Sequence, residues 1–144
     1  MLIIEDDPER IRWFEMHMPQ DFRAVPVQSA GRAIGLLSRD SFPAKRKHVY
    51  GGILMDHDLD MQTVMREEHG FTGSHVIEAI IRYISNEIPV LVHSMNPQKA
   101  PGMVNKLNGA GFNVLRLPYA DLTPDLFAEW INDLRENWFD LHEE

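Results

Sequence analysis

The sequence predicts an α/β fold in which helices cover both faces of a five-stranded parallel sheet. Two observations support this fold class. Five short apolar segments alternate with five segments of helical periodicity, and this alternation is typical of βαβ units with parallel strands. Polar clusters directly follow three of the apolar segments, as expected where ligands bind at the carboxyl ends of such strands. The expected strand order is 2-1-3-4-5, with right-handed crossovers.

The composition bounds the domain organisation and the class of protein. We expect a single domain over residues 1–144, since 144 residues with 44% hydrophobic content can form one full core. The absence of cysteine excludes disulfides, thiolate metal sites and a cysteine nucleophile, and is consistent with a cytoplasmic protein. No apolar run reaches transmembrane length, so we expect no membrane contact. The net charge of −8 argues against a broad grip on nucleic acid, although a nucleotide or an RNA end could still enter a local pocket.

The elements follow from periodicity, turn residues and caps. The expected strands cover residues 1–5, 23–27, 50–55, 88–92 and 112–117. The expected helices cover about 8–18, 30–39, 74–86 and 101–110, and a last helix begins at Thr123 and Pro124. Asp7, Ser29 and Thr123 are the expected N-caps.

The apolar faces of these helices predict the core. Inward positions are Ile11, Phe14, Met18, Ala33, Ile34, Leu37, Val76, Ile77, Ile80, Ile81, Ile84, Met103, Val104, Leu107, Leu126, Phe127, Trp130, Ile131, Leu134 and Trp138. We expect the acidic tail 140–144 to be frayed.

Three polar clusters should converge on one cleft, outside the first, third and fourth strands. Their members are Glu5, Asp6 and Asp7; Asp56, His57 and Asp58; and His93, Ser94 and Asn96. Convergence of three strand ends on the ligand-binding edge of such a sheet is the main evidence for a functional site. Acids and histidines placed together there indicate a metal or a bound anion.

Two connections are open to more than one interpretation. Residues 40–48 carry a basic run, Lys45-Arg46-Lys47-His48, which is either a solvated loop or a contact for a phosphate-bearing ligand. The loop 59–70 carries His69, and a loop of this length is often functional or mobile.

The pattern of strand-end residues resembles the receiver domain of response regulators, which has a flavodoxin-like fold, over almost the whole chain. By that resemblance, Asp6 and Asp7 match the metal-binding acids, Asp56 the phospho-acceptor aspartate and Ser94 the switch hydroxyl. Receivers carry a lysine before the proline that follows strand five, where this chain has Leu117, so ordinary phosphorylation signalling is not expected. Arg116 lies one residue earlier and should point to the other face of the sheet.

Further residues resemble one divergent receiver branch, which is proposed to process cyclic phosphates and occurs in RNA-repair and phage contexts. The resemblance is carried by Asp56-His57-Asp58-Leu59, Gly70-Phe71 and His93-Ser94-Met95-Asn96. It implies a small phosphorylated ligand or an RNA end as the partner.

Opening a cyclic phosphodiester requires an activated water, a proton for the leaving oxygen and neutralisation of phosphoryl charge. His57 and His93 are the candidate acid and base, with their roles unassigned, because histidine titrates near neutral pH. The expected ligands for Mg²⁺ or Mn²⁺ are the carboxylates of Asp6, Asp7, Asp56 and Asp58. Ser94, Asn96 and His69 are candidates for substrate binding. Asp56 as a covalent nucleophile is a further catalytic variant.

Three functions therefore remain open from the sequence. The first is a metal-dependent phosphoesterase acting on a cyclic phosphate of a nucleotide or RNA end. The second is a non-catalytic module that senses a phosphorylated ligand, and the third is a receiver-like domain that mediates protein interaction. A haloacid-dehalogenase-type phosphatase is disfavoured, since that class places Asp-x-Asp after its first strand and needs a lysine and a later acidic pair.

Overall fold

The computed structural model describes residues 1–41, 50–56 and 72–142. Its strands are β1 (Leu2–Ile4), β2 (Val25–Val27), β3 (Ile53–Met55), β4 (Val90–Val92) and β5 (Val114–Arg116). Its helices are α1 (Pro8–Met16), α2 (Ala30–Ser41), α3 (Gly73–Tyr83), α4 (Ala100–Gly109), the 3₁₀ turn η3 (Tyr119–Asp121) and α5 (Pro124–His142).

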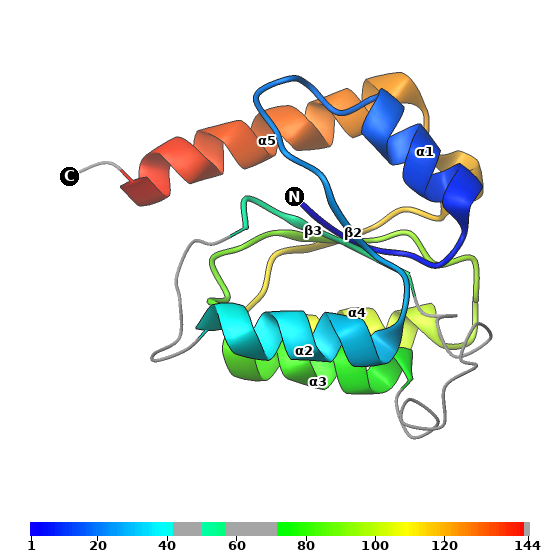
Figure 1. Ribbon diagram of the computed structural model, residues 1–144, viewed down its shortest axis with the longest axis vertical. Coiled ribbons are helices and arrows are strands. Elements are labelled where there is room, and N and C mark those ends of the chain that lie inside the picture. The colour runs from blue at the N-terminus through cyan, green and yellow to red at the C-terminus, as the bar shows by residue number, and fades with distance from the viewer. Residues whose placement is uncertain (42–49, 57–71, 143–144) are drawn as a thin grey trace.

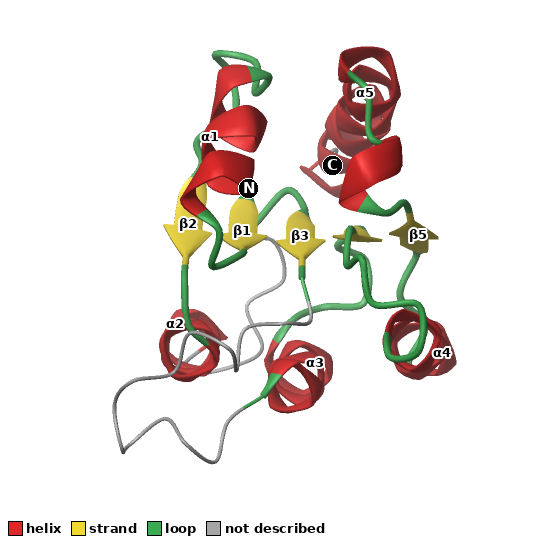
Figure 2. Ribbon diagram, turned by 90° about the vertical axis from the view of Figure 1, so that its right-hand side faces the viewer, coloured by secondary structure: helices red, strands yellow, loops and turns green. Residues whose placement is uncertain are grey.

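The five strands form one parallel sheet in the order β2-β1-β3-β4-β5, as predicted. Figure 2 looks toward the carboxyl ends of the strands and shows α1 and α5 on one face of the sheet and α2, α3 and α4 on the other. The predicted fold class, with helices on both faces, is therefore confirmed.

Alternation along each strand divides the core between the two faces. Leu2, Ile4 and the matching positions of β3 and β4 pack toward α2, α3 and α4. Ile3, Leu54 and Leu91 pack toward α1 and α5, in a second cluster that includes Phe14, Phe127, Trp130 and Leu134. The residue that follows each of β1, β3 and β4 has the parity of this second set and so faces α1 and α5.

The caps form where the sequence predicts them. Asp7 accepts a hydrogen bond from the Glu9 amide, Ser29 from the Arg32 amide and Thr123 from the Leu126 amide. Each of these side chains accepts a hydrogen bond from a backbone N–H group that has no partner within the helix.

Several helix ends differ from the predicted ones: α2 continues to Ser41 instead of residue 39, and α3 ends at Tyr83 instead of residue 86. Helix α1 stops at Met16, so Met18 lies beyond it and is only half-buried. Helix α5 continues through residue 142 instead of fraying from residue 140. Leu126, expected in the core, is 39% exposed; it lies in the first turn of α5, at the edge of the helix face that carries the buried Trp130 and Leu134.

Edge strand β2 is protected from further pairing by Pro26. Val25 and Val27 exchange hydrogen bonds with β1, so residue 26 faces outward. Proline has no N–H to offer to an added strand, and it is found on edges for this reason.

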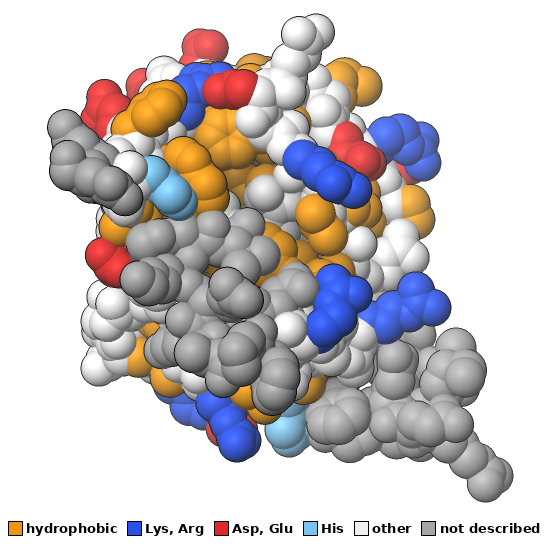
Figure 3. All heavy atoms as spheres, turned by 60° about the vertical axis from the view of Figure 1, so that its left-hand side comes forward, with side chains coloured by type: hydrophobic (Ala, Val, Ile, Leu, Met, Phe, Trp, Pro, Cys, Tyr) orange, Lys and Arg blue, Asp and Glu red, His pale blue; other side chains and the backbone are white. Residues whose placement is uncertain are grey.

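Among the described residues, no helix is both long enough and apolar enough to cross a membrane. On the face shown in Figure 3, acidic and basic side chains are mixed near the top, and a few basic side chains lie together at the lower right.

Candidate functional site

Three chemically active side chains form one row across the sheet. Glu5, Asp56 and His93 are each the first residue after a strand, and the register aligns Ile4 with Met55 and Met55 with Val92. The backbone ladder continues into this row, since the Asp56 amide donates to the Ile4 carbonyl at 2.9 Å and the His93 amide to the Met55 carbonyl at 3.0 Å. Neighbouring parallel strands therefore bring the three side chains together.

The row is buried beneath α1. Glu5 and His93 are 0% exposed and Asp56 is 2% exposed. The Phe14 ring of α1 packs edge-on against the His93 ring, with 4.9 Å between centroids. Buried acids and imidazoles are costly unless they are paired, hydrogen-bonded or bound to a metal.

Glu5 is held by hydrogen bonds to both of its carboxyl oxygens. Its Oε1 lies 2.9 Å from His93 Nε2. Its Oε2 accepts from the backbone amides of Asp6 at 2.9 Å and Asp7 at 3.1 Å. These bonds fix the carboxyl group against the first turn leading to α1.

His93 is uncharged at neutral pH. Burial lowers its pKa to about 4; the charge of Asp56 opposes this shift, and that of Arg10 adds to it. Because a carboxylate only accepts hydrogen bonds, Nε2 carries the proton and Nδ1 the lone pair. Within the described part of the chain, the buried Nδ1 atom has no hydrogen-bond partner.

Asp6 and Asp7 lie beside the row. Burial, a hydrogen bond to Glu5 and the negative charge of Glu5 together raise the pKa of Asp6 to about 7. Asp7 is used at the helix start, where its Oδ1 accepts from Glu9 at 2.9 Å, and its Oδ2 lies 3.7 Å from Arg10 Nε.

The row could hold a metal ion. One ligand atom from each of Glu5, Asp56 and His93 can be chosen so that all three lie within 4.8 Å of one another. One imidazole nitrogen of His93 and two carboxylates form a donor set that suits a divalent cation. Of the predicted metal ligands, Asp56 is in this group. Asp58 lies outside the described residues.

Ser94 and Asn96, the predicted substrate-binding residues after β4, stabilise the turn into α4. The buried Ser94 hydroxyl accepts from the Asn96 amide at 3.1 Å. The Asn96 side-chain oxygen accepts from the amides of Gln98 and Lys99, each at 3.0 Å. In the same segment, His93 lies close to Asp56 and Glu5.

The position that follows β5 is apolar. Leu117 packs with the α1 and α5 core. Arg116 donates to the Ser94 carbonyl at 3.1 Å, and Val114, two residues before it, packs on the opposite core cluster.

Several predicted residues lie outside the described part of the chain. These are the candidate catalytic His57, the candidate ligand Asp58, the candidate substrate-binding His69 and the basic run 45–48.

Sequence reasoning placed Glu5 in the converging cluster but did not assign it as a ligand, and it did not single out Arg10. The strand register could have identified Glu5 as a candidate ligand, because the first residues after β1, β3 and β4 lie in the same row. Arg10 NH1 lies 3.7 Å from Glu5 Oε1, and the guanidinium lies 4.9 Å from the centre of the Tyr119 ring. This contact depends on tertiary packing between α1 and η3.

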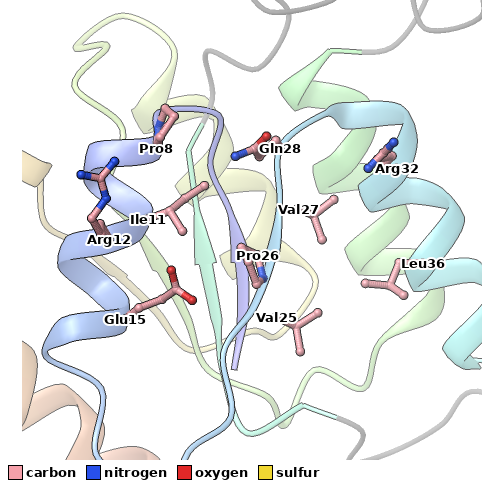
Figure 4. Close-up of a pocket in the computed structure, with 10 residues that line it drawn as sticks. All are labelled: Pro8, Ile11, Arg12, Glu15, Val25, Pro26, Val27, Gln28, Arg32 and Leu36. Carbon is pink, nitrogen blue, oxygen red and sulfur yellow. The ribbon is translucent and has the colours of Figure 1, made fainter.

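A surface groove of about 600 Å³ lies elsewhere, between α1, edge strand β2 and α2. Figure 4 shows its lining residues, which include Arg12, Pro26 and Arg32. None of the row residues lines it, so the groove and the acid–histidine row are separate features.

Comparisons with known proteins give the fold and the family. The signal receiver domain of a putative Luxo repressor protein from Vibrio parahaemolyticus has a TM-score of 0.63 at 18% identity, over 99% of this chain and 95% of that chain. A fusion of the yeast Spc42 trimeric coiled coil to another structure has a TM-score of 0.62 at 17% identity, over 99% of this chain and 80% of that chain. No curated protein matches the sequence.

A family model described as the cyclic-phosphate processing receiver domain matches residues 1–109, a span that contains the whole row. The predicted resemblance is confirmed, and the chain belongs to the cyclic-phosphate processing receiver domain family.

Proposed function

We propose that this domain is a metal-dependent phosphoesterase that opens the cyclic phosphate of a nucleotide or of an RNA end. The observation that supports the proposal is the buried row of Glu5, Asp56 and His93 at the carboxyl edge of the sheet. The family's description as cyclic-phosphate processing is consistent with this chemistry.

The donor set favours Mn²⁺ over Mg²⁺ as the metal. Mg²⁺ prefers oxygen ligands alone, whereas first-row transition metals such as Mn²⁺ also accept an imidazole nitrogen. A bound divalent ion would polarise the phosphoryl group and lower the pKa of a bound water. Glu5, Asp56 and His93 would hold the ion, and the remaining positions would be open to substrate and water.

His93 acts in its neutral form. With a pKa of about 4, only roughly one imidazole in a thousand is protonated at pH 7, so His93 is a poor proton donor there. Neutral imidazole is also the form that binds metals. The proton for the leaving oxygen then falls to another group, and His57 stays the predicted donor.

The proposed reaction is a hydrolysis. The oxygen of one water forms a bond to phosphorus, and the ring P–O bond breaks. One proton of that water passes to a base, and the leaving sugar oxygen receives a proton. The product is a ribose phosphomonoester with a free neighbouring hydroxyl.

The proposed substrate class is a small phosphorylated ligand or a single RNA end. Carboxyl groups outnumber the one described guanidinium around the row, and the chain carries a net charge of −8. Such a site suits recognition of one phosphate with a metal in place, and it does not suit a long nucleic-acid interface.

The test is hydrolysis of 2′,3′-cyclic AMP, followed by ³¹P NMR and chromatography, with Mn²⁺, with Mg²⁺ and with EDTA. The variants are Asp56→Asn, His93→Asn and His57→Ala. Matched controls are Asp140→Asn and His142→Asn, which change the same residue types on exposed positions at the far end of α5.

We expect turnover that requires the metal and falls by about a hundredfold or more in each site variant, with both controls at the wild-type rate. Absence of turnover, with ligand-dependent thermal stabilisation of the wild type, would contradict the esterase and indicate a sensing module. Neither turnover nor stabilisation would indicate a protein-interaction domain.

A further inference from the structure

The candidate site has a cation that the proposed catalytic set does not use. Arg10 projects from the first turns of α1, and its side chain is 26% exposed, so it is in contact with both the site and solvent. Its NH1 atom lies 3.7 Å from Glu5 Oε1, the same oxygen that lies 2.9 Å from His93 Nε2. The guanidinium therefore lies beside the Glu5 carboxylate of the row.

Arg10 is positioned without being saturated by strong hydrogen bonds. Its ion pairs to Glu5 and Asp7 are both 3.7 Å long, beyond hydrogen-bonding range. The Tyr119 ring lies under the guanidinium at 4.9 Å, and the Tyr119 amide donates to the His93 carbonyl at 3.0 Å. The Tyr119 ring therefore orients the Arg10 guanidinium by stacking, and the guanidinium N–H groups remain available to a ligand.

The end of strand β5 supplies no cation to the site. Leu117 packs in the α1 and α5 core, and the Arg116 guanidinium bonds to the Ser94 carbonyl. Both Leu117 and Arg10 belong to the α1 and α5 side of the sheet. Among the described residues, α1 thus supplies a positive charge to this side of the site through Arg10.

We propose that Arg10 binds the phosphoryl oxygens of the ligand at this site, as the guanidinium counterpart of the metal. The inference rests on the proposed function for the kind of ligand, a phosphate ester. Arginine suits this role because its fork can donate two parallel hydrogen bonds to one phosphate. Binding of a phosphate would replace two weak 3.7 Å ion pairs with charge-assisted hydrogen bonds.

The test is calorimetric binding of adenosine 2′-monophosphate, a ring-opened product, at saturating Mn²⁺, together with a separate titration of Mn²⁺ alone. The variants are Arg10→Gln and Arg10→Met; the methionine keeps an apolar stem over Tyr119. The matched control is Arg12→Gln, which removes the same charge from an exposed position on the same helix, beside the β2 groove (Figure 4).

We expect Arg10→Gln and Arg10→Met to weaken nucleotide binding by about tenfold or more, and Arg12→Gln to leave it within twofold. The affinity for Mn²⁺ alone should stay the same or rise in the Arg10 variants, since a positive charge near the metal is removed. A general structural defect would weaken both affinities together.

Wild-type nucleotide affinity in either folded Arg10 variant would overturn the proposal, and so would parallel loss of both affinities. The result is separable from the proposed function. Arg10-dependent binding by a protein that does not turn over 2′,3′-cyclic AMP would keep the assignment of Arg10 while contradicting the esterase.

Discussion

His93 Nε2 lies 2.9 Å from Glu5 Oε1, and neither side chain is exposed. The other oxygen of Glu5 accepts from two backbone amides, so the carboxylate has no freedom to turn. This arrangement makes Glu5 the group that sets the protonated nitrogen of His93.

Glu5→Gln should move the proton of His93 from Nε2 to Nδ1. Glutamine has one oxygen, which the two backbone amides would keep, and its NH₂ group would then face Nε2 and require an acceptor there. We expect ¹⁵N NMR to report an Nε2–H imidazole in the wild type and an Nδ1–H imidazole in the variant. We also expect a loss of about 1–3 kcal/mol in the free energy of unfolding.

The control for this change is Glu78→Gln, an exposed position whose ion pair with Lys106 is 3.6 Å long. It should leave the tautomer and the stability unchanged. The same tautomer in wild type and Glu5→Gln would contradict the assignment of Glu5.

The pKa values of Asp6 and His93 predict opposing pH dependences in metal-free protein. His93 has a folded-state pKa of about 4 against an ordinary 6.5. Between these values the unfolded chain binds the extra proton, so this contribution to stability rises with pH. Asp6 has a folded-state pKa of about 7 against 3.8, so there the folded protein binds the extra proton and stability falls as pH rises.

Asp6→Asn should separate the two effects, because asparagine mimics the protonated acid and can still donate to Glu5. We expect the variant to match the wild type below pH 4 and to gain stability on it steadily up to about pH 7. Urea unfolding in EDTA at several pH values measures this, with the exposed Asp133→Asn as control. A constant difference between variant and wild type across this range would contradict the raised pKa of Asp6.

Sequence patterns could predict the fold and the edge of the sheet that carries the site, because alternation, caps and strand-end polarity are local signals. They could not fix which strand-end residues share a row. Three adjacent acids, Glu5, Asp6 and Asp7, follow the first strand. The pairing of Ile4 with Met55 is what places Glu5, the first of them, beside Asp56. The place of Arg10 beside the site could not be predicted from the sequence, because it depends on how α1 packs against Tyr119. Leu126 was misplaced because helical spacing does not show how far the covered face of α5 extends around the helix.

Mn²⁺ should stabilise the protein through the row. At a hundred times the dissociation constant, one site adds about 2.7 kcal/mol, or roughly 8 °C in melting temperature for a chain of this length. We expect this shift in the wild type and in Asp140→Asn, and its loss in Asp56→Asn. An equal shift in Asp56→Asn would place the ion elsewhere.

Gly52 should be intolerant of a side chain because α5 lies directly against the start of β3. A Cβ at this position would come within 2.7 Å and 3.1 Å of the two Leu134 methyl carbons and 3.3 Å of the Trp130 ring. Leu134 is fully buried, so its methyl carbons would have to shift within the core, and Gly52→Ala should cost about 1–3 kcal/mol through overpacking.

Gly35→Ala in α2 and Gly102→Ala in α4 are matched controls, since a Cβ at either position meets nothing within 4 Å. Alanine is the better helix former, so each should stabilise the protein by about 0.5–1 kcal/mol. Chemical denaturation of the three variants gives the comparison. Equal stability of Gly52→Ala and the wild type would mean that α5 can shift away from β3 without cost. The close packing of Leu134 and Trp130 would then not fix the position of α5 on the sheet.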